Sequence, residues 1–172
     1  MAASREELMH FLDELGIETS TVEHPAVFTV AESHEIIDNL PGGHTKNLFL
    51  KDKKGNLFLI VALNDAKIDL KATGPLIGAS GRVSFGKPDL LMEVLGVEPG
   101  SVTPFSLIND RAARRVTVVL DAAMMEHDLL NYHPLQNTAT TAISSGDLLK
   151  FVRACGHEPQ VLSVSAQAQE AH

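Results

Sequence analysis

The sequence predicts an α+β fold in which a mixed, curled β-sheet is surrounded by short helices. About eight short strands and five short helices are interleaved irregularly, so the regular strand–helix alternation of a doubly wound fold is missing. Residues 57–63 (LFLIVAL) are apolar on both faces, which predicts a central strand covered on each side. No shift in composition divides the 172 residues. We therefore expect a single domain over residues 1–165, followed by a disordered tail over residues 166–172.

Capping residues mark the predicted helices. Ser4 with Glu7 forms a capping box that opens the first helix, and Thr29 with Glu32 forms another that opens a helix running to Leu40. Helices are also predicted over residues 69–77, 88–95 and from Ser144 or Ser145 to just before Gly156.

The predicted strands follow from β-branched and apolar runs bounded by turn residues. Residues 46–51 and 57–63 form a hairpin around the polar turn 52–56. The other strands are predicted at residues 19–23, 82–85, 116–120, 129–132, 138–143 and 160–165.

Composition excludes several classes of protein. Tryptophan is absent and there is one tyrosine, which argues against an aromatic platform for single-stranded nucleic acid. The single cysteine, Cys155, excludes an internal disulfide framework and a multi-cysteine metal site, and its helical setting predicts a small buried hydrophobe. No apolar run approaches the roughly 20 residues of a membrane span, and the N-terminus lacks a signal-peptide pattern. We expect a cytoplasmic protein with no membrane partner.

Charge is distributed unevenly along the chain. The net charge is −8, but residues 41–90 hold eight basic and four acidic residues, whereas residues 1–40 hold one basic and nine acidic. A basic segment in an acidic protein can bind a polyanion locally, and a solvated lysine face is the alternative that charge alone favours. The net acidity argues against binding to long duplexes, so DNA is not an expected partner.

Common cofactor and catalytic motifs are absent. The sequence has no GxGxxG, GxxxxGK[ST], HExxH or GxSxG. The eight histidines never fall at i, i+4 within one predicted helix, so no metal site is expected, and no cofactor is implied.

Three polar segments remain as candidates for chemistry. Lys46 and Asn47 lie at the mouth of a strand after a glycine loop, where a lysine can reach a phosphate or carboxylate. Residues 100–104 (GSVTP) form a loop whose amide groups can hold a carbonyl oxygen, and residues 133–138 (HPLQNT) form a turn before a strand. Each segment taken alone also has an ordinary explanation. Lys46 could be an exposed lysine at a strand edge, residues 100–104 a plain connector, and residues 133–138 a turn before a strand.

Together, these segments resemble the prolyl-tRNA editing domain (YbaK-like) family. The strings GGHTKNLFLKDKKGNLFL, IDLKATGPLIGASGRVSFG, LGVEPGSVTPFSLIND and HPLQNTATTAIS carry the resemblance, which extends in layout from about Ser4 to about Val164. Within the family, the chain is most similar to the freestanding bacterial alanyl-tRNA(Pro) deacylase (ProX-type) branch.

The resemblance implies hydrolysis of the ester between a wrong amino acid and the 3′ end of tRNA, assisted by the substrate's own 2′-hydroxyl. Lys46 would anchor the terminal nucleotide, Asn47 would bond the ribose or aminoacyl group, and His133 would shape the pocket or bond the substrate. The matching residues with a catalytic role are Lys46, Asn47, Gly100, Ser101 and His133, and those that would bind substrate are Val102, Thr103 and Pro104.

The implied partner is the acceptor end of tRNA(Pro) carrying alanine, and whether prolyl-tRNA synthetase is a further partner stays open. A pocket that admits alanine and rejects proline would act as a second sieve. Because of the local positive charge, we expect Arg82 and Lys71 to contact the acceptor stem. The alternatives are a cysteinyl- or seryl-tRNA deacylase of the same family and an inactive tRNA-binding domain; a metal-dependent hydrolase is disfavoured because ligand spacing is missing.

Overall fold

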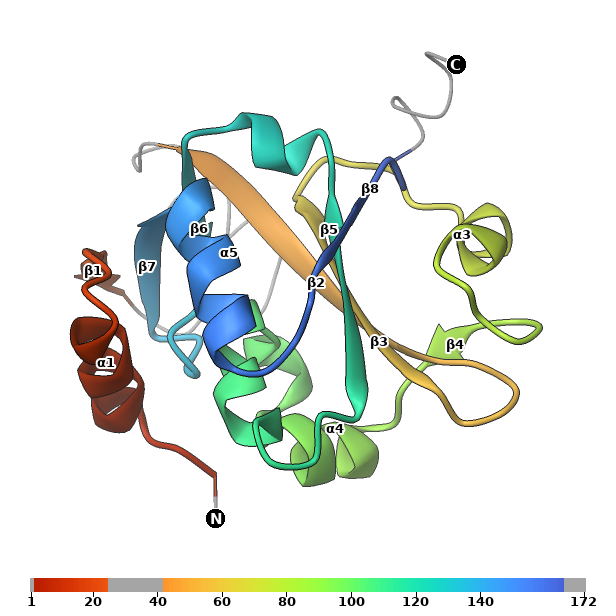
Figure 1. Ribbon diagram of the computed structural model, residues 1–172, viewed down its shortest axis with the longest axis horizontal. Coiled ribbons are helices and arrows are strands. Elements are labelled where there is room, and N and C mark those ends of the chain that lie inside the picture. The colour runs from red at the N-terminus through yellow and green to blue at the C-terminus, as the bar shows by residue number, and fades with distance from the viewer. Residues whose placement is uncertain (1, 25–41, 166–172) are drawn as a thin grey trace.

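The computed structural model describes residues 2–24 and 42–165, and in them the chain folds around one eight-stranded sheet (Figure 1). The strand order is β1-β7-β6-β2-β3-β5-β8, and β4 pairs with β2 off this path. The strands are β1 (Ser20–Glu23), β2 (Gly43–Lys51), β3 (Leu57–Leu63), β4 (Ser84–Phe85), β5 (Val116–Asp121), β6 (Leu129–Tyr132), β7 (Ala139–Ser144) and β8 (Gln160–Leu162).

The sheet is mixed, as predicted. The β1–β7, β6–β7, β2–β3 and β2–β4 pairs are antiparallel, whereas β2–β6, β3–β5 and β5–β8 are parallel. The parallel joint between β2 and β6 is short and consists of Gly43 opposite Leu130 and His44 opposite Asn131. This joint connects β1, β7 and β6 to the other strands.

Short helices surround the sheet. In Figure 1, α1 lies beside β1 at one end of the molecule, and α3 lies beside β4 at the other. The α-helices are α1 (Arg5–Glu14), α3 (Leu70–Leu76), α4 (Pro88–Leu95) and α5 (Ser145–Ala154), and the 3₁₀ helices are η1 (Pro99–Ser101), η2 (Pro104–Asp110) and η3 (Met124–Glu126). Within the described ranges, no helix has the length and apolar character needed to cross a bilayer.

The predicted caps are confirmed at three helices. Ser4 and Glu7 form both bonds of the capping box at α1, and Ser144 accepts from the Asp147 amide at the start of α5. Helix α4 starts at Pro88 and ends at Gly96, which has a positive φ. The helix predicted at 29–40 and the tail at 166–172 lie outside the described residues.

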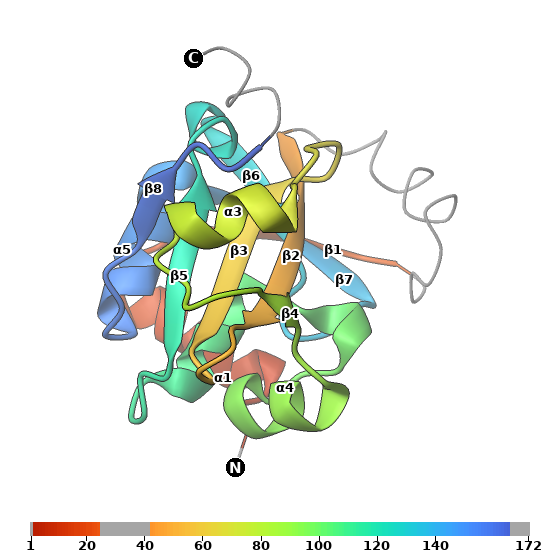
Figure 2. The same ribbon diagram turned by 90° about the vertical axis from the view of Figure 1, so that its right-hand side faces the viewer.

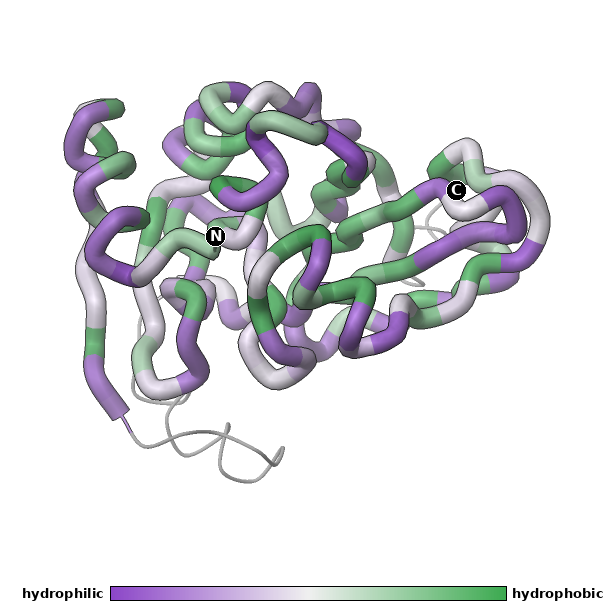
Figure 3. Tube along the Cα trace, turned by 90° about the horizontal axis from the view of Figure 1, so that it is seen from below, coloured by the Kyte–Doolittle hydropathy of each residue, from purple (hydrophilic) through white to green (hydrophobic). Residues whose placement is uncertain are grey.

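Apolar side chains form a cluster on each face of the central strands. The larger cluster includes Phe105, Tyr132 and Phe151, whose rings pack edge to face with centroids 5.9 Å and 5.4 Å from Phe105. The smaller cluster lies beside α3, which crosses the other face in Figure 2. Strand β3 is buried over residues 57–62, which confirms the predicted central strand. Figure 3 shows hydrophobic (green) and hydrophilic (purple) segments alternating along the chain.

Three predicted strand boundaries were wrong. Strand β2 begins at Gly43 because this glycine already pairs with β6, and an added Cβ would lie 3.1 Å from a Leu130 methyl. Strand β4 has only two residues, since Gly81 before it adopts a positive φ. Strand β8 stops at Leu162, after which the Val164 and Ser165 amides donate to the Asp121 carboxylate instead of to a neighbouring strand.

Candidate functional site

The β2–β6 joint brings Lys46 and His133 to one face of the sheet. His44 lies opposite Asn131, Lys46 follows His44 by two residues, and His133 follows Asn131 by two. Because side chains alternate along strands, this register places Lys46 and His133 on the same side. The Lys46 ammonium donates a hydrogen bond to the Ala66 carbonyl, in the loop between β3 and α3. An ammonium has three donors, so two remain for a ligand.

The His133 ring is held in one tautomer. Its Nδ1 lies 3.1 Å from the Ala139 carbonyl oxygen, which can only accept, so Nδ1 carries the proton. Burial lowers the pKa of His133, the bond to Ala139 opposes this change, and the nearby His24 ring lowers the pKa further. The ring is therefore neutral near pH 7, and Nε2 is an unprotonated acceptor.

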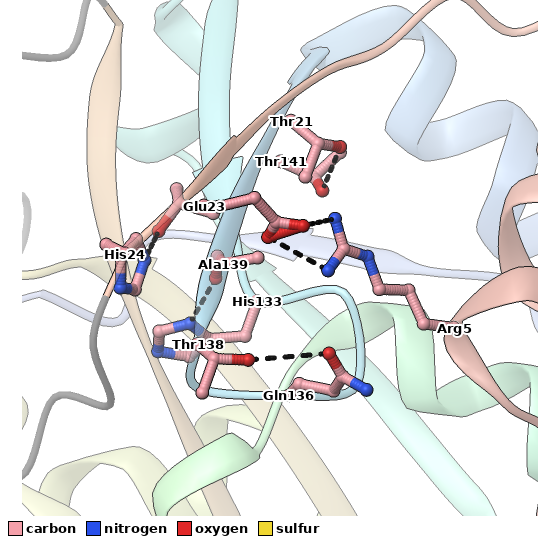
Figure 4. Close-up of polar contacts among 10 residues, drawn as sticks. Arg5, Thr21, Glu23, His24, His133, Gln136, Thr138, Ala139 and Thr141 are labelled. Carbon is pink, nitrogen blue, oxygen red and sulfur yellow. Dashed lines mark hydrogen bonds and ion pairs between the residues drawn. The ribbon is translucent and has the colours of Figure 1, made fainter.

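A second histidine, His24, lies at this face and was not among the predicted site residues. Its main chain extends β1 by bonding the Thr138 carbonyl, and its Nε2 lies 2.8 Å from the Thr140 hydroxyl (Figure 4). In the sequence, His24 precedes Pro25 and was interpreted only as the end of the predicted strand at residues 19–23. Its position two residues after Val22 on an edge strand is the signal that could have placed it on the face of Val22.

The loop at residues 100–104 packs against the loop that follows His133. An added Cβ at Gly100 would lie 3.5 Å from the Asn137 amide nitrogen, and the Phe105 ring packs on Tyr132, the residue before His133. The structure thus brings together two of the three segments that carried the family resemblance. The β2–β6 joint also places β2, the strand of Lys46 and Asn47, next to β6, the strand that leads to His133.

Several residues of this loop are engaged within it. The Ser101 amide donates to the Glu98 carbonyl, at 2.9 Å, which closes the η1 turn. Thr103 is fully buried and its hydroxyl accepts from the Phe105 amide, while Pro104 is buried at the start of η2. Val102 packs against the larger core cluster. These contacts fix the loop's conformation and leave Gly100 exposed at its tip.

Asn47 faces away from Lys46, because neighbouring residues of a strand point to opposite sides. It lies two residues before Phe49, a member of the larger cluster. Its Oδ1 is buried and has no hydrogen-bond partner in the described part of the chain. Side chains alternate along the strand predicted at residues 46–51, so the sequence alone could have shown that Lys46 and Asn47 point to opposite faces of the sheet.

Helix α3, which contains Lys71, and strand β4, which Arg82 precedes by two residues, lie at the other end of the molecule from β6 and β7 (Figure 1). Both are exposed: Lys71 is in the first turn of α3, and Arg82 follows the positive-φ Gly81. They are not part of the cluster around His133.

A hollow of about 300 Å³ lies next to His24 and Thr140. It opens on the face that strand alternation assigns to Val22, Asn131 and Thr140. Its lining residues are Glu18, Thr19, Ser20, Val22, Leu129, Asn131, Thr140 and Ala142. The walls are largely apolar with a few polar groups, as in many small-molecule sites.

Comparison with known proteins identifies the family of this chain. Residues 24–151 match the family model of the aminoacyl-tRNA editing domain. The chain belongs to this family. The matched range contains Lys46, the 100–104 loop and His133.

Two relatives of this editing domain align over most of their length. Prolyl-tRNA synthetase associated domain-containing protein 1 of Mus musculus is 43% identical over 92% of this chain and 95% of that protein. Prolyl-tRNA editing protein ProX of Acetoanaerobium sticklandii is 40% identical over 85% of this chain and 88% of that protein. A solved structure provisionally described as a trans-editing enzyme for prolyl tRNA synthetase has the same fold, with a TM-score of 0.68 at 18% identity, covering 94% and 97% of the two chains.

Metal ions require a set of ligand side chains that lie close together. In residues 2–24 and 42–165, no three His, Cys, Asp or Glu side chains come together as ligands. Cys155 is buried, and burial raises the pKa of its thiol to about 12, so it stays protonated near pH 7. The groups near His133 that we consider for chemistry are the Lys46 ammonium, the neutral His133 imidazole and main-chain amides.

Proposed function

We propose that this protein is a trans-editing hydrolase that deacylates alanyl-tRNA(Pro), cleaving the ester at the 3′ end of the tRNA. The observation that carries the proposal is the placement of Lys46 and His133 on one face, together with the contact of the exposed Gly100 turn with Asn137 in the loop that follows His133. The name of the ProX relative supports prolyl-tRNA editing as the task. Alanine as the amino acid and tRNA(Pro) as the carrier are part of the proposal.

An aminoacyl ester is already activated, so the protein has mainly to position it, polarise its carbonyl and admit water. We assign the anchoring of the terminal nucleotide to Lys46. Its ammonium is oriented by the Ala66 carbonyl and directs its other N–H groups toward a phosphate or ribose oxygen. In this role Lys46 stays charged and acts as an electrostatic anchor.

His133 suits a different role because its Nε2 can accept a proton. The 2′-hydroxyl next to the ester donates a hydrogen bond to His133 Nε2. This bond makes the hydroxyl oxygen more basic, so that the hydroxyl can better assist the attack of water on the ester. The bond from Nδ1 to the Ala139 carbonyl holds the ring in the tautomer that this requires. The protein then needs no nucleophile of its own.

Gly100 completes the proposed site as an amide donor to the ester carbonyl as negative charge develops on its oxygen. An exposed turn next to Asn137 can approach a substrate closely because no side chain is present. The other residues predicted for the site stay part of the proposal: Asn47, Ser101, Val102, Thr103 and Pro104. Of these, Ser101, Thr103 and Pro104 would act by holding the shape of the 100–104 loop.

The proposal is tested by following the loss of [¹⁴C]alanine from alanyl-tRNA(Pro) and alanyl-tRNA(Ala). We expect the wild type to hydrolyse the first ester faster, and Lys46→Ala to lower kcat/KM by about 100-fold, as for loss of one electrostatic contact to the reacting end. Lys150→Ala is the matched control, since Lys150 is an exposed lysine on α5. Equal rates for Lys46→Ala and the control would refute the assignment.

The amino acid is tested in the same assay with cysteinyl- and seryl-tRNA(Pro). Faster hydrolysis of either would replace alanine as the substrate, and binding of tRNA without hydrolysis of any ester would identify a binding domain. Gly100→Ala adds a further test. An alanine Cβ there meets only ordinary contact with Asn137, so the fold should tolerate it, and a loss of kcat would report on the substrate.

A further inference from the structure

Five exposed cations gather around the turn between β2 and β3. Lys51 ends β2, and Lys53 and Lys54 form the turn; Arg82 and Lys87 flank the β4 strand that pairs with β2. We call these five residues the hairpin cation surface. The loop with Arg82 touches the turn directly, because the Lys53 amide donates to the Ser80 carbonyl and an added Cβ at Gly81 would lie 3.3 Å from the Lys53 Cβ.

Asp52 holds the two parts of this surface together. One carboxylate oxygen accepts from the Lys54 and Asn56 amides, and the other accepts from the Asn56 side chain and the Ser80 amide. Burial alone would raise the pKa of Asp52, but the bonds from Ser80, Asn56 and Lys54 outweigh burial and hold the pKa at about 2. The loop is therefore pinned to the turn over the whole range of physiological pH.

The charge of the surface is not neutralised within the described residues. None of the five cations forms an ion pair there, and the Asp52 carboxylate is 3% exposed with its oxygens directed to N–H donors. In a chain of net charge −8, a fixed group of five positive charges is a local attractor for a polyanion. Because Asp52 already holds the backbone of the turn and of the loop, binding would have to order only the side chains of the cations.

We propose that the hairpin cation surface binds the phosphate backbone of the tRNA acceptor arm, upstream of the terminal adenosine. This inference rests on the proposed function and adds the surface that receives the body of the substrate. Lys46 and Lys51 lie five residues apart on one strand, which is about 17 Å at the rise of a β-strand. The surface is therefore too far from Lys46 to touch the terminal nucleotide, and strand alternation directs Lys51 to the opposite face of the sheet from Lys46. We assign to this surface the nucleotides that precede the terminal one.

The test measures binding of uncharged tRNA(Pro) at several salt concentrations, for the wild type and for the double variant Lys53→Gln/Arg82→Gln. Each phosphate contact contributes about 0.7–0.9 to the slope of log K against log salt. Removing two contacts should lower the slope by about 1.5 and weaken binding at 0.1 M salt by about 30-fold relative to the wild type. A trinucleotide CCA should bind both proteins equally.

The matched control is Lys150→Gln/Arg153→Gln, which removes one lysine and one arginine from the exposed side of α5. Equal losses in the two double variants would overturn the proposal, because net charge alone would explain them, and an unchanged slope in Lys53→Gln/Arg82→Gln would also overturn it. The charge-preserving variant Lys53→Arg/Arg82→Lys should bind as the wild type does, which separates charge from folding. Because uncharged tRNA is used, a protein that hydrolyses no ester would refute the proposed function and still give a result for the surface.

Discussion

The buried pair of Asp110 and His157 should make a large contribution to stability, which the variant Asp110→Ala measures. Asp110 is 1% exposed and ends η2, the helix that follows the Gly100 loop. Its carboxylate accepts from the Arg115 and Val116 amides at 3.0 Å and from His157 Nε2 at 2.9 Å. The variant leaves two backbone amides and a buried ring nitrogen without this acceptor.

The magnitude follows from these three lost bonds. A buried donor left without a partner costs about 1–3 kcal/mol, and breaking one side of a buried pair costs about 3–5 kcal/mol. We expect a loss of about 4 kcal/mol in the free energy of unfolding. For a chain of this size, about 2–4 °C of Tm per kcal/mol gives a decrease of about 8–16 °C.

The dependence on pH has a defined sign. Burial would raise the pKa of Asp110, but the bonds from His157, Arg115 and Val116 lower it by more. A carboxyl whose folded-state pKa is depressed stabilises the fold above its unfolded pKa, near 3.8, and this contribution is lost as the pH falls through the folded-state pKa. The contribution of the Asp110 carboxylate to the difference between wild type and variant should therefore shrink below about pH 4.

Urea unfolding at pH 7 and at pH 3 measures both quantities. Asp89→Ala, which removes an exposed carboxylate from α4, should change the free energy by less than about 0.5 kcal/mol. A loss below 1 kcal/mol in Asp110→Ala would refute the reasoning about unpaired buried donors.

Three further predictions follow from other contacts. Gly86→Ala should destabilise the fold by about 1–3 kcal/mol in urea unfolding, because the new Cβ would lie 2.4 Å from the Phe49 ring, and an unchanged midpoint would contradict that contact. Cys155 has a pKa near 12 through burial, so a thiol reagent at pH 8 should label it only as the protein unfolds; labelling of the native protein at the rate of a free thiol would be inconsistent with this burial. Since burial lowers the pKa of His133, kcat/KM for the alanyl ester should be level from pH 7 to 8 and fall on the acid side, at a pH below 6.5, whereas His133→Gln should lack this acid limb.

Local signals predicted much of the fold. The Ser4 capping box, the hairpin around residues 52–56 and the apolar strand at 57–63 are features whose cause lies within a few residues, and each is confirmed. Asp69 caps α3 with its side chain, as the predicted start of that helix required. Short-range patterns are reliable here because caps and turns satisfy backbone groups locally.

Long-range contacts account for what the sequence could not predict. The β2–β6 joint pairs residues that are 87 positions apart, and no local pattern near Gly43 or His44 predicts this pairing. The bond between Asp110 and His157 spans 47 positions and likewise has no local pattern. For the candidate site, the family resemblance selected Lys46 and His133, but their common face follows only from the register of two distant strands.

The two-residue joint between β2 and β6 also has a mechanical consequence. Lys46 lies on a strand of one ladder and His133 follows a strand of the other. In the described residues the ladders are joined by two residue pairs and by two side-chain bonds, from the Thr45 hydroxyl to the Asn131 carbonyl and from the Asn131 side-chain amide to the Gly43 carbonyl. Small rotations of one ladder against the other would change the separation of ammonium and imidazole without breaking a bond inside either ladder. The distance between the Lys46 ammonium and the His133 ring therefore depends on the β2–β6 joint. Weakening this joint would lower turnover before it unfolds the protein.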